Sequence, residues 1–81
     1  MKYVLFIKEE CPFCIKAKEL LIEKNENFKL VTFNHSQEEV LKEIKEAYDW
    51  PTVPMIFHVT DSATMKFVGG YTDLERHLNE Q

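Results

Sequence analysis

Residues 3–14 read YVLFIKEECPFC, and this stretch contains both cysteines of the chain. Its first five residues are apolar, β-branched or aromatic, which is typical of a short strand buried on both faces. A polar loop, Lys8-Glu9-Glu10, follows. Cys11 then stands at an N-cap position, and Pro12 at the first helical position, where its missing N–H costs nothing. The stretch therefore predicts a strand over Tyr3–Ile7, a short loop, and a helix that begins at the cysteines.

Beyond this stretch, strand and helix signals alternate. The first helix is expected near residues 12–25, with an apolar face at helical spacing. A second strand follows over Phe28–Phe33. Ser36 and Glu39 match the capping-box pattern and predict the start of a second helix, which must end before Pro51. Two sets of side chains form the expected apolar faces: Phe13, Ala17, Leu20 and Leu21 in the first helix, and Val40, Leu41, Ile44, Ala47 and Tyr48 in the second.

The last third of the chain predicts a hairpin and a short helix. Strands over Met55–Val59 and Met65–Val68 flank a turn at residues 61–64. Gly69-Gly70 then breaks the chain, and Thr72 with Glu75 predicts a capping box for the last helix. The element order is β-α-β-α-β-β-α. This order predicts one α/β domain over residues 1–81, in which three helices flank both faces of a four-stranded mixed sheet.

Composition narrows the function classes. The 81 residues carry a net charge of −4, which argues against a general nucleic-acid binder because such proteins carry a basic face. No apolar run is long enough to span a membrane. The N-terminal run is broken too early for an export signal. We therefore expect a cytoplasmic protein, in a compartment that keeps thiols reduced.

The Cys11/Cys14 pair is expected to be chemical rather than structural. A disulfide between them would close a very small loop and constrain little of the unfolded chain. At a helix start, unpaired N–H groups and the helix dipole stabilise a thiolate, which is the reactive form of cysteine. Cys11 is therefore predicted to be the attacking sulfur. Cys14, three residues on and closer to the apolar face, is predicted to resolve the mixed disulfide.

Other interpretations of these residues stay open. A CxxC pair can be half of a zinc site, but zinc needs further ligands at short spacing. The three histidines, His35, His58 and His77, are far apart in sequence, so we expect no metal. Lys8 could favour a nearby thiolate or be a solvated loop residue. Pro54 begins a strand, where it costs a ladder hydrogen bond. A cis Val53–Pro54 bond would present the Val53 backbone to an extended peptide, whereas a trans bond would merely end a loop.

Three segments together resemble the glutaredoxin family over nearly the whole chain. They are Phe6–Cys14, Thr52-Val53-Pro54 and Val68–Leu74. The resemblance implies a thioredoxin-like fold with a cis-proline at Pro54. It also implies a glutathione-dependent thiol–disulfide oxidoreductase that reduces protein disulfides and glutathione mixed disulfides through Cys11 and Cys14.

The resemblance further implies a glutathione site. Lys8 would pair with a glutathione carboxylate, and the Val53 backbone, within Thr52-Val53-Pro54, would pair with the cysteinyl part. The γ-glutamyl end would lie at Gly70, Thr72 and Asp73, where a helix start offers N–H groups and a carboxylate accepts from an ammonium. Phe13 replaces the family's more common tyrosine and keeps a ring beside the sulfur.

The chain departs from the family pattern in two places. Trp50-Pro51 resembles single-cysteine glutaredoxins that carry iron–sulfur clusters, although those have glycine and serine where this chain has Pro12 and Cys14. Tyr48-Asp49 stands where the family has a basic residue or glutamine, which predicts a weaker contact to the glycine carboxylate of glutathione. An iron–sulfur carrier and a glutaredoxin-like thioredoxin, reduced by thioredoxin reductase, are therefore the alternative functions. The expected partners of a monomer are glutathione and disulfide-containing proteins, with ribonucleotide reductase a possibility at family level.

Overall fold

The computed structural model describes residues 2–80. The chain forms β1 (Lys2–Lys8), α1 (Pro12–Glu23), β2 (Asn27–Phe33), the 3-10 turn η1 (His35–Gln37), α2 (Glu38–Ala47), β3 (Met55–Val59), β4 (Met65–Gly69) and α3 (Tyr71–Asn79). The β-α-β-α-β-β-α order expected from the sequence is confirmed. None of the helices within residues 2–80 is long and apolar enough to cross a membrane.

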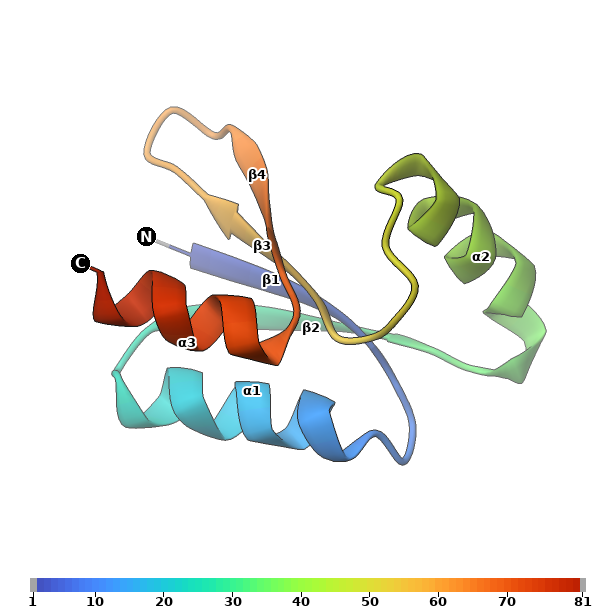
Figure 1. Ribbon diagram of the computed structural model, residues 1–81, viewed down its shortest axis with the longest axis horizontal. Coiled ribbons are helices and arrows are strands. Elements are labelled where there is room, and N and C mark those ends of the chain that lie inside the picture. Colours follow the sequence, from blue (N-terminus) through green and yellow to red (C-terminus); the bar gives the residue numbers. More distant parts are fainter. Residues whose placement is uncertain (1, 81) are drawn as a thin grey trace.

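The four strands form one mixed sheet in the order β2-β1-β3-β4 (Figure 1). β1 runs parallel to β2 and antiparallel to β3, and β3 and β4 form an antiparallel hairpin. The parallel pair is joined across α1, as a strand–helix–strand crossover requires. The expected mixed sheet is thereby confirmed.

The main core lies between the sheet and the helices α1 and α3, which run side by side in Figure 1. Alternate residues of each strand point to this face. Six side chains in this core have no measurable exposure: Tyr3, Leu5, Ala17, Leu21, Ile56 and Leu74. Ala17 and Leu21 anchor α1 in this core, and the helix carries the cysteines at its start.

The opposite face of the sheet is aromatic. Phe6, Phe33, Phe57 and Phe67 contribute rings whose neighbouring centroids lie 5.0–5.4 Å apart. Residues at and after the end of α2 complete the cluster, because Tyr48 and Trp50 pack against Phe67 at 5.2 and 5.3 Å. Helix α2 thus continues into a loop that is fixed by ring contacts.

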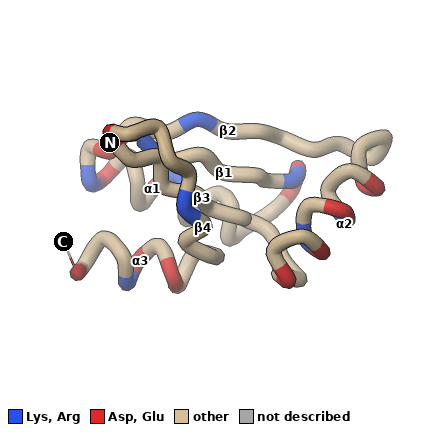
Figure 2. Tube along the Cα trace, turned by 90° about the horizontal axis from the view of Figure 1, so that it is seen from above, with Lys and Arg blue, Asp and Glu red and all other residues tan. Residues whose placement is uncertain are grey.

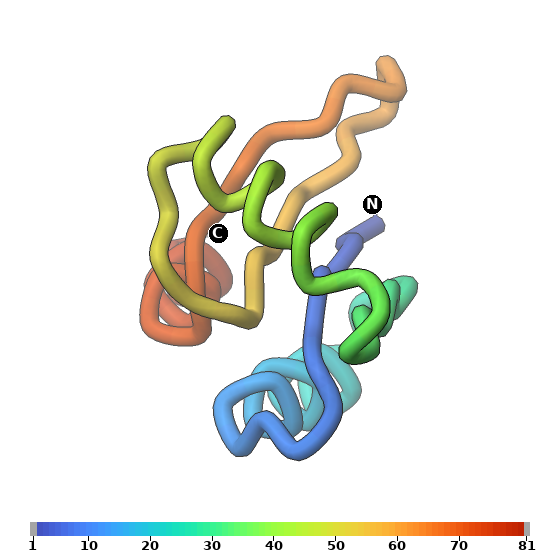
Figure 3. Tube along the Cα trace, turned by 90° about the vertical axis from the view of Figure 1, so that its right-hand side faces the viewer, coloured from blue at the N-terminus to red at the C-terminus, as the bar shows by residue number. Residues whose placement is uncertain are grey.

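The sheet topology brings three distant segments to one edge. Phe6 pairs with Met55, so the loop after β1 and the loop before β3 lie next to each other. β4 runs antiparallel to β3 and ends at Gly69, opposite Ile56. Figure 3 shows the loop between α2 and β3 passing the start of α3. Cys11, Pro54 and Gly70 therefore meet although they are far apart in the sequence.

The second helix does not begin as the sequence predicted. The predicted box of Ser36 and Glu39 is wrong, because Asn34 and Gln37 form a capping box at the start of η1. α2 follows directly from η1 and, within the described part of the chain, has no side-chain cap of its own. Asn34 Oδ1 accepts hydrogen bonds from the Ser36 N–H (3.0 Å) and hydroxyl (2.6 Å), and Gln37 Oε1 accepts one from the Asn34 N–H (3.1 Å). β2 runs to Phe33, so the capping turn must follow at once. Ser36 lies inside that turn, where it donates to Asn34 and does not cap α2.

Other boundaries shift by one or two residues. α1 ends at Glu23, two residues before its expected end at residue 25, and Asn25 takes a left-handed φ of 56° just beyond it. Phe13 was expected on the apolar face of α1 but is 54% exposed, and the buried Cys14 belongs to that face instead. Ala17 and Leu21 are buried there as expected. Val40, Ala47 and Tyr48 are likewise exposed, whereas Leu41 is buried.

Candidate active site

Cys11 is the N-cap of α1. Its backbone is extended (φ −111°, ψ 105°), and its Sγ accepts a hydrogen bond from the Cys14 N–H at 3.2 Å. The Ile15 N–H donates to the Cys11 carbonyl at 3.1 Å, which closes the first helical turn. The sulfur therefore lies at the positive end of the helix, where a thiolate is stabilised. The N-cap position predicted for Cys11 is confirmed.

Cys11 and Cys14 are joined by a disulfide bond, with their Cα atoms 5.2 Å apart. Their surroundings differ. Cys14 is only 3% exposed and lies among the core-facing residues of α1, whereas Cys11 is half-buried. An incoming sulfur can therefore reach Cys11 more easily than Cys14. This difference is the one expected between an attacking and a resolving cysteine.

The Val53–Pro54 peptide bond is cis, as the family resemblance implied. Val53 presents its carbonyl oxygen 3.9 Å from Cys11 Sγ. Pro54 is buried and leads directly into β3. The backbone of Val53 therefore borders the sulfur, beside which an extended ligand would lie.

The third segment is the turn between β4 and α3. Gly69 adopts φ +126°, and a Cβ there would lie 2.5 Å from Asp73 Oδ2, so this turn requires glycine. The Gly70 N–H donates to Asp73 Oδ2 at 3.0 Å. The predicted capping box of Thr72 and Glu75 is therefore wrong. The capping box lies two residues earlier, with Gly70 as N-cap and Asp73 as the residue that closes it.

These segments enclose a groove of about 320 Å³. Seven of the predicted ligand-binding residues line it: Phe13, Thr52, Val53, Pro54, Gly70, Thr72 and Asp73. Phe13 forms one wall, where Lys16 Nζ lies 4.9 Å from its ring centroid and Tyr71 packs 6.1 Å away. The structure thus brings together residues from both ends of the chain, beside Cys11. Their role in binding glutathione stays a prediction.

Lys8 does not join this groove. It lines a separate pocket of about 150 Å³ together with Glu9, Glu10, Phe33, Asn34, His35 and Glu38. Its Nζ lies 3.8 Å from Glu38 Oε1. The Lys8 ammonium is therefore close to the cysteine motif in the sequence, but in the structure it is already paired with the Glu38 carboxylate.

Two groove residues were missed by the sequence analysis. Trp50 was noted there only as part of the Trp50-Pro51 departure from the family pattern, yet its indole lines the groove and would lie 3.5 Å from a Cβ on Gly70. Tyr71 follows Gly70 and contributes its ring to the same groove. The sequence did contain a signal for both residues, because Trp50 lies just before the predicted binding segment Thr52-Val53-Pro54 and Tyr71 lies within the one at Gly70–Asp73.

The histidines do not join the cysteines. His58 and His77 lie with their rings 5.1 Å apart and each packs on Tyr3, whereas His35 is almost fully exposed. Across residues 2–80, no group of three or more His, Cys, Asp or Glu side chains is arranged around a common metal position.

The fold and the site together have the features of a thioredoxin-like protein. A mixed sheet carries a disulfide-forming cysteine pair at the start of its first helix, opposite a cis-proline. Of the solved structures compared, the solution structure of glutaredoxin from Brucella melitensis superposes with a TM-score of 0.75 at 28% identity, covering 99% of this chain and 80% of that one. The thioredoxin-like fold expected from the sequence is thereby confirmed.

Sequence comparison identifies the family. The Glutaredoxin family pattern matches residues 3–61. Glutaredoxin 1 of Rickettsia felis is 44% identical over 55 residues, which are 67% of this chain and 54% of that protein. The hybrid peroxiredoxin hyPrx5 of Haemophilus influenzae is 33% identical over 91% of this chain. This chain belongs to the glutaredoxin family. It spans 28% of the length of the hybrid peroxiredoxin and about half of that of the Rickettsia protein.

Proposed function

We propose that this chain is a glutathione-dependent thiol–disulfide oxidoreductase. One observation carries the proposal. The N-cap Cys11 is disulfide-bonded to the buried Cys14, and its Sγ lies 3.9 Å from the carbonyl oxygen of Val53, a residue of the groove that Phe13, Trp50, residues 52–54 and residues 70–73 line. Family membership supports the same reaction class. A half-buried sulfur next to an open groove is suited to exchange with a disulfide that enters from solvent.

The proposed cycle is thiolate exchange. The Cys11 thiolate attacks one sulfur of a protein disulfide, forms a mixed disulfide and expels the other sulfur as a thiolate. Cys14, deprotonated, attacks Cys11 Sγ, which releases the second substrate thiolate and leaves the Cys11–Cys14 disulfide. One glutathione thiolate then opens this bond to give glutathionylated Cys11. A second glutathione removes the first as glutathione disulfide, and both cysteines are again thiols.

Glutathione fits the groove by its chemical groups. Its peptide backbone would lie along Val53, next to Cys11 Sγ. Its γ-glutamyl end would meet the start of α3, where free N–H groups favour a carboxylate. Asp73 already accepts from the Gly70 N–H, and its other oxygen could accept from an ammonium. We place this chemistry in the cytoplasm, where glutathione is the main thiol.

The test is reduction of a small mixed disulfide, coupled to NADPH oxidation. One arm contains glutathione with glutathione reductase, and the other contains thioredoxin reductase alone. Turnover in the first arm only is the expected result. Turnover in the second arm only would overturn the glutathione assignment and favour a glutaredoxin-like thioredoxin.

Cysteine variants separate the two sulfurs. Cys11→Ser should reduce turnover to the uncatalysed rate, because no thiolate is then positioned at the helix start. Cys14→Ser should stop reduction of a protein disulfide but spare removal of glutathione from a glutathionylated peptide, which needs one cysteine. Both activities are measured in the glutathione arm. Retained activity in Cys11→Ser would show that the nucleophile is assigned wrongly.

A peroxiredoxin is one protein substrate that a specific observation favours. The relative from Haemophilus influenzae is named a hybrid peroxiredoxin, and this chain matches only 28% of its length. We propose that this chain can reduce the disulfide of a separate peroxiredoxin. Adding it with glutathione to an oxidised peroxiredoxin should restore peroxide consumption, and Cys11→Ser should not.

A further inference from the structure

The ion pair between Lys8 and Glu38 lies outside the groove beside Cys11. Lys8 ends β1 and pairs in register with Phe33, the last residue of β2. Side chains of paired positions point to the same face of the sheet, so Lys8 faces the segment that follows β2. Glu38 begins α2 on that segment, and its Oε1 lies 3.8 Å from Lys8 Nζ.

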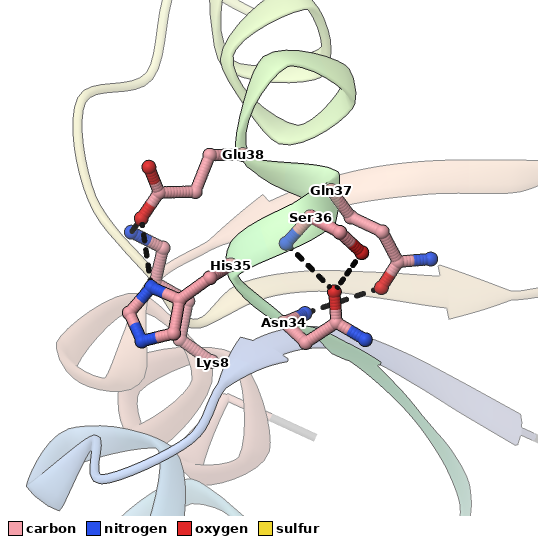
Figure 4. Close-up of polar contacts among 6 residues, drawn as sticks. All are labelled: Lys8, Asn34, His35, Ser36, Gln37 and Glu38. Carbon is pink, nitrogen blue, oxygen red and sulfur yellow. Dashed lines mark hydrogen bonds and ion pairs between the residues drawn. The ribbon is translucent and has the colours of Figure 1, made fainter.

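Glu38 is positioned by the capping turn rather than by chance. Asn34 accepts two hydrogen bonds from Ser36, and Gln37 accepts one from the Asn34 N–H. Figure 4 shows this turn directing the Glu38 carboxylate toward Lys8, with His35 Nδ1 3.5 Å from the same oxygen. The turn therefore fixes where α2 begins and which of its carboxylates reaches Lys8.

We propose that Glu38 sets the affinity of the site for anionic thiol ligands by competing with them for the Lys8 ammonium. This inference rests on the proposed function and on the family resemblance, which implies that a glutathione carboxylate reaching beyond the groove pairs with Lys8. A ligand carboxylate can use Lys8 fully only when it displaces Glu38. Glu38 is therefore a positioning residue that acts through Lys8 and has no contact with the reacting sulfurs.

The expected size of the effect follows from exposure. The Lys8 and Glu38 side chains are 38% and 56% exposed, and exposed ion pairs are weak and screened by salt. Removing the competing charge should therefore strengthen binding of an anionic ligand by about two- to fivefold. A ligand without carboxylates should gain nothing from the change.

Glu39 provides a matched control. It is exposed, and it shares the first turn of α2 with Glu38, so neutralising either residue has the same effect on the helix dipole and on net charge. Figure 2 shows Asp and Glu positions recurring along α2, so a general charge effect must be subtracted. Any difference between Glu38→Gln and Glu39→Gln then reports the contact with Lys8.

The experiment measures kcat and KM of the full chain with glutathione and glutathione reductase. The substrates are two forms of one neutral peptide, modified at its cysteine by glutathione or by cysteamine. Glu38→Gln should lower KM for the glutathionylated peptide by about two- to fivefold, with kcat unchanged, and should not lower KM for the cysteamine form. Glu39→Gln should match the wild type, and Lys8→Met should abolish the effect of Glu38→Gln in the double variant.

Four results would overturn the proposal. If Glu38→Gln and Glu39→Gln lowered KM equally, the cause would be the loss of a negative charge on α2 and not the contact with Lys8. A Glu38→Gln effect that persists in the Lys8→Met background would show that Lys8 is not the intermediary. A wild type that is active with glutathione, but whose KM is unaffected by Glu38→Gln, would reject this inference and leave the proposed function standing. A wild type inactive with glutathione would reject both.

Discussion

The face of the sheet beneath α1 and α3 is centred on side chains with no measurable exposure, whereas the face beneath α2 is packed with aromatic rings, of which Phe57 is buried and several others are partly exposed. On the first face, Leu5, Leu21 and Leu74 have no measurable exposure. On the second, Phe67 and Trp50 are half-buried, and Tyr48 is 47% exposed.

This difference separates stability from ligand binding. The first face fixes α1, and with it the N-cap position of Cys11, through close aliphatic packing. The second face ends in Trp50, whose indole is shared between the ring cluster and the groove. We therefore expect changes on the first face to act on the free energy of unfolding, and changes on the second to act on ligand affinity as well.

The largest expected effect is on the first face. Leu21→Ala should lower the free energy of unfolding by about 2–5 kcal/mol, because it leaves a cavity in a fully buried site. In a small domain this is a large share of the total of about 5–15 kcal/mol. Ile22→Ala is the control, since Ile22 is the next residue of α1 and is 54% exposed. Urea unfolding curves should separate the two variants, and similar losses in both would contradict the division of faces.

Much of this architecture could be predicted from the sequence. β3 was predicted to the residue, and the cysteine helix was placed by Cys11 and Pro12. The prediction is correct for these two segments because a single local signal dominates each of them. The buried strand is a continuous apolar run, and proline at the first helical position fixes where α1 begins.

Both helix starts that were wrong had competing local signals. Two pairs match the capping-box pattern, Asn34 with Gln37 and Ser36 with Glu39, and their N-cap positions differ by two residues. The end of β2 at Phe33 decides which pair forms the box. At α3, the left-handed backbone of Gly69 brings Asp73 to the Gly70 N–H. In both cases the choice depends on where the preceding strand ends, which is set by pairing with a distant strand.

The candidate site divides in the same way. The sequence supplied three binding segments, and the structure joins them in one groove. It could not supply the pairing of Lys8 with Glu38, because that contact follows from the register of β1 against β2. Nor could it show that Trp50 faces the groove rather than α2.

A moderate effect is expected from the second face. Phe67→Leu should cost about 1 kcal/mol of stability, because a similar volume is kept while the ring contacts are lost. It should also raise KM for a glutathionylated peptide, since Trp50 loses the ring that packs 5.3 Å from its own. The chain has one tryptophan, so its emission maximum reports the change directly. In Leu21→Ala, the folded protein should keep both the emission maximum and KM of the wild type.

The smallest effect concerns the polar corner of the first face, where His58 stacks on Tyr3 and contacts His77. Burial, followed by the charge of His77, lowers the pKa of His58 below its ordinary value of 6.5. The unfolded chain therefore binds a proton on this histidine more readily than the folded chain does. The contribution of neutral His58 to stability is complete above pH 6.5 and is lost as the pH falls through the lowered pKa of the folded state.

His58→Gln should accordingly flatten the dependence of Tm on pH below pH 6.5, the ordinary value for this group. His77→Gln should flatten it partly, because it removes the second cause of the shift and leaves the burial. His35→Gln is the control, because the His35 side chain is 99% exposed. Thermal unfolding of the three variants across the acid range would place the acid sensitivity on the first face if only the first two change the slope. An equal change in His35→Gln would show instead that net charge, and not this corner, sets the response to acid.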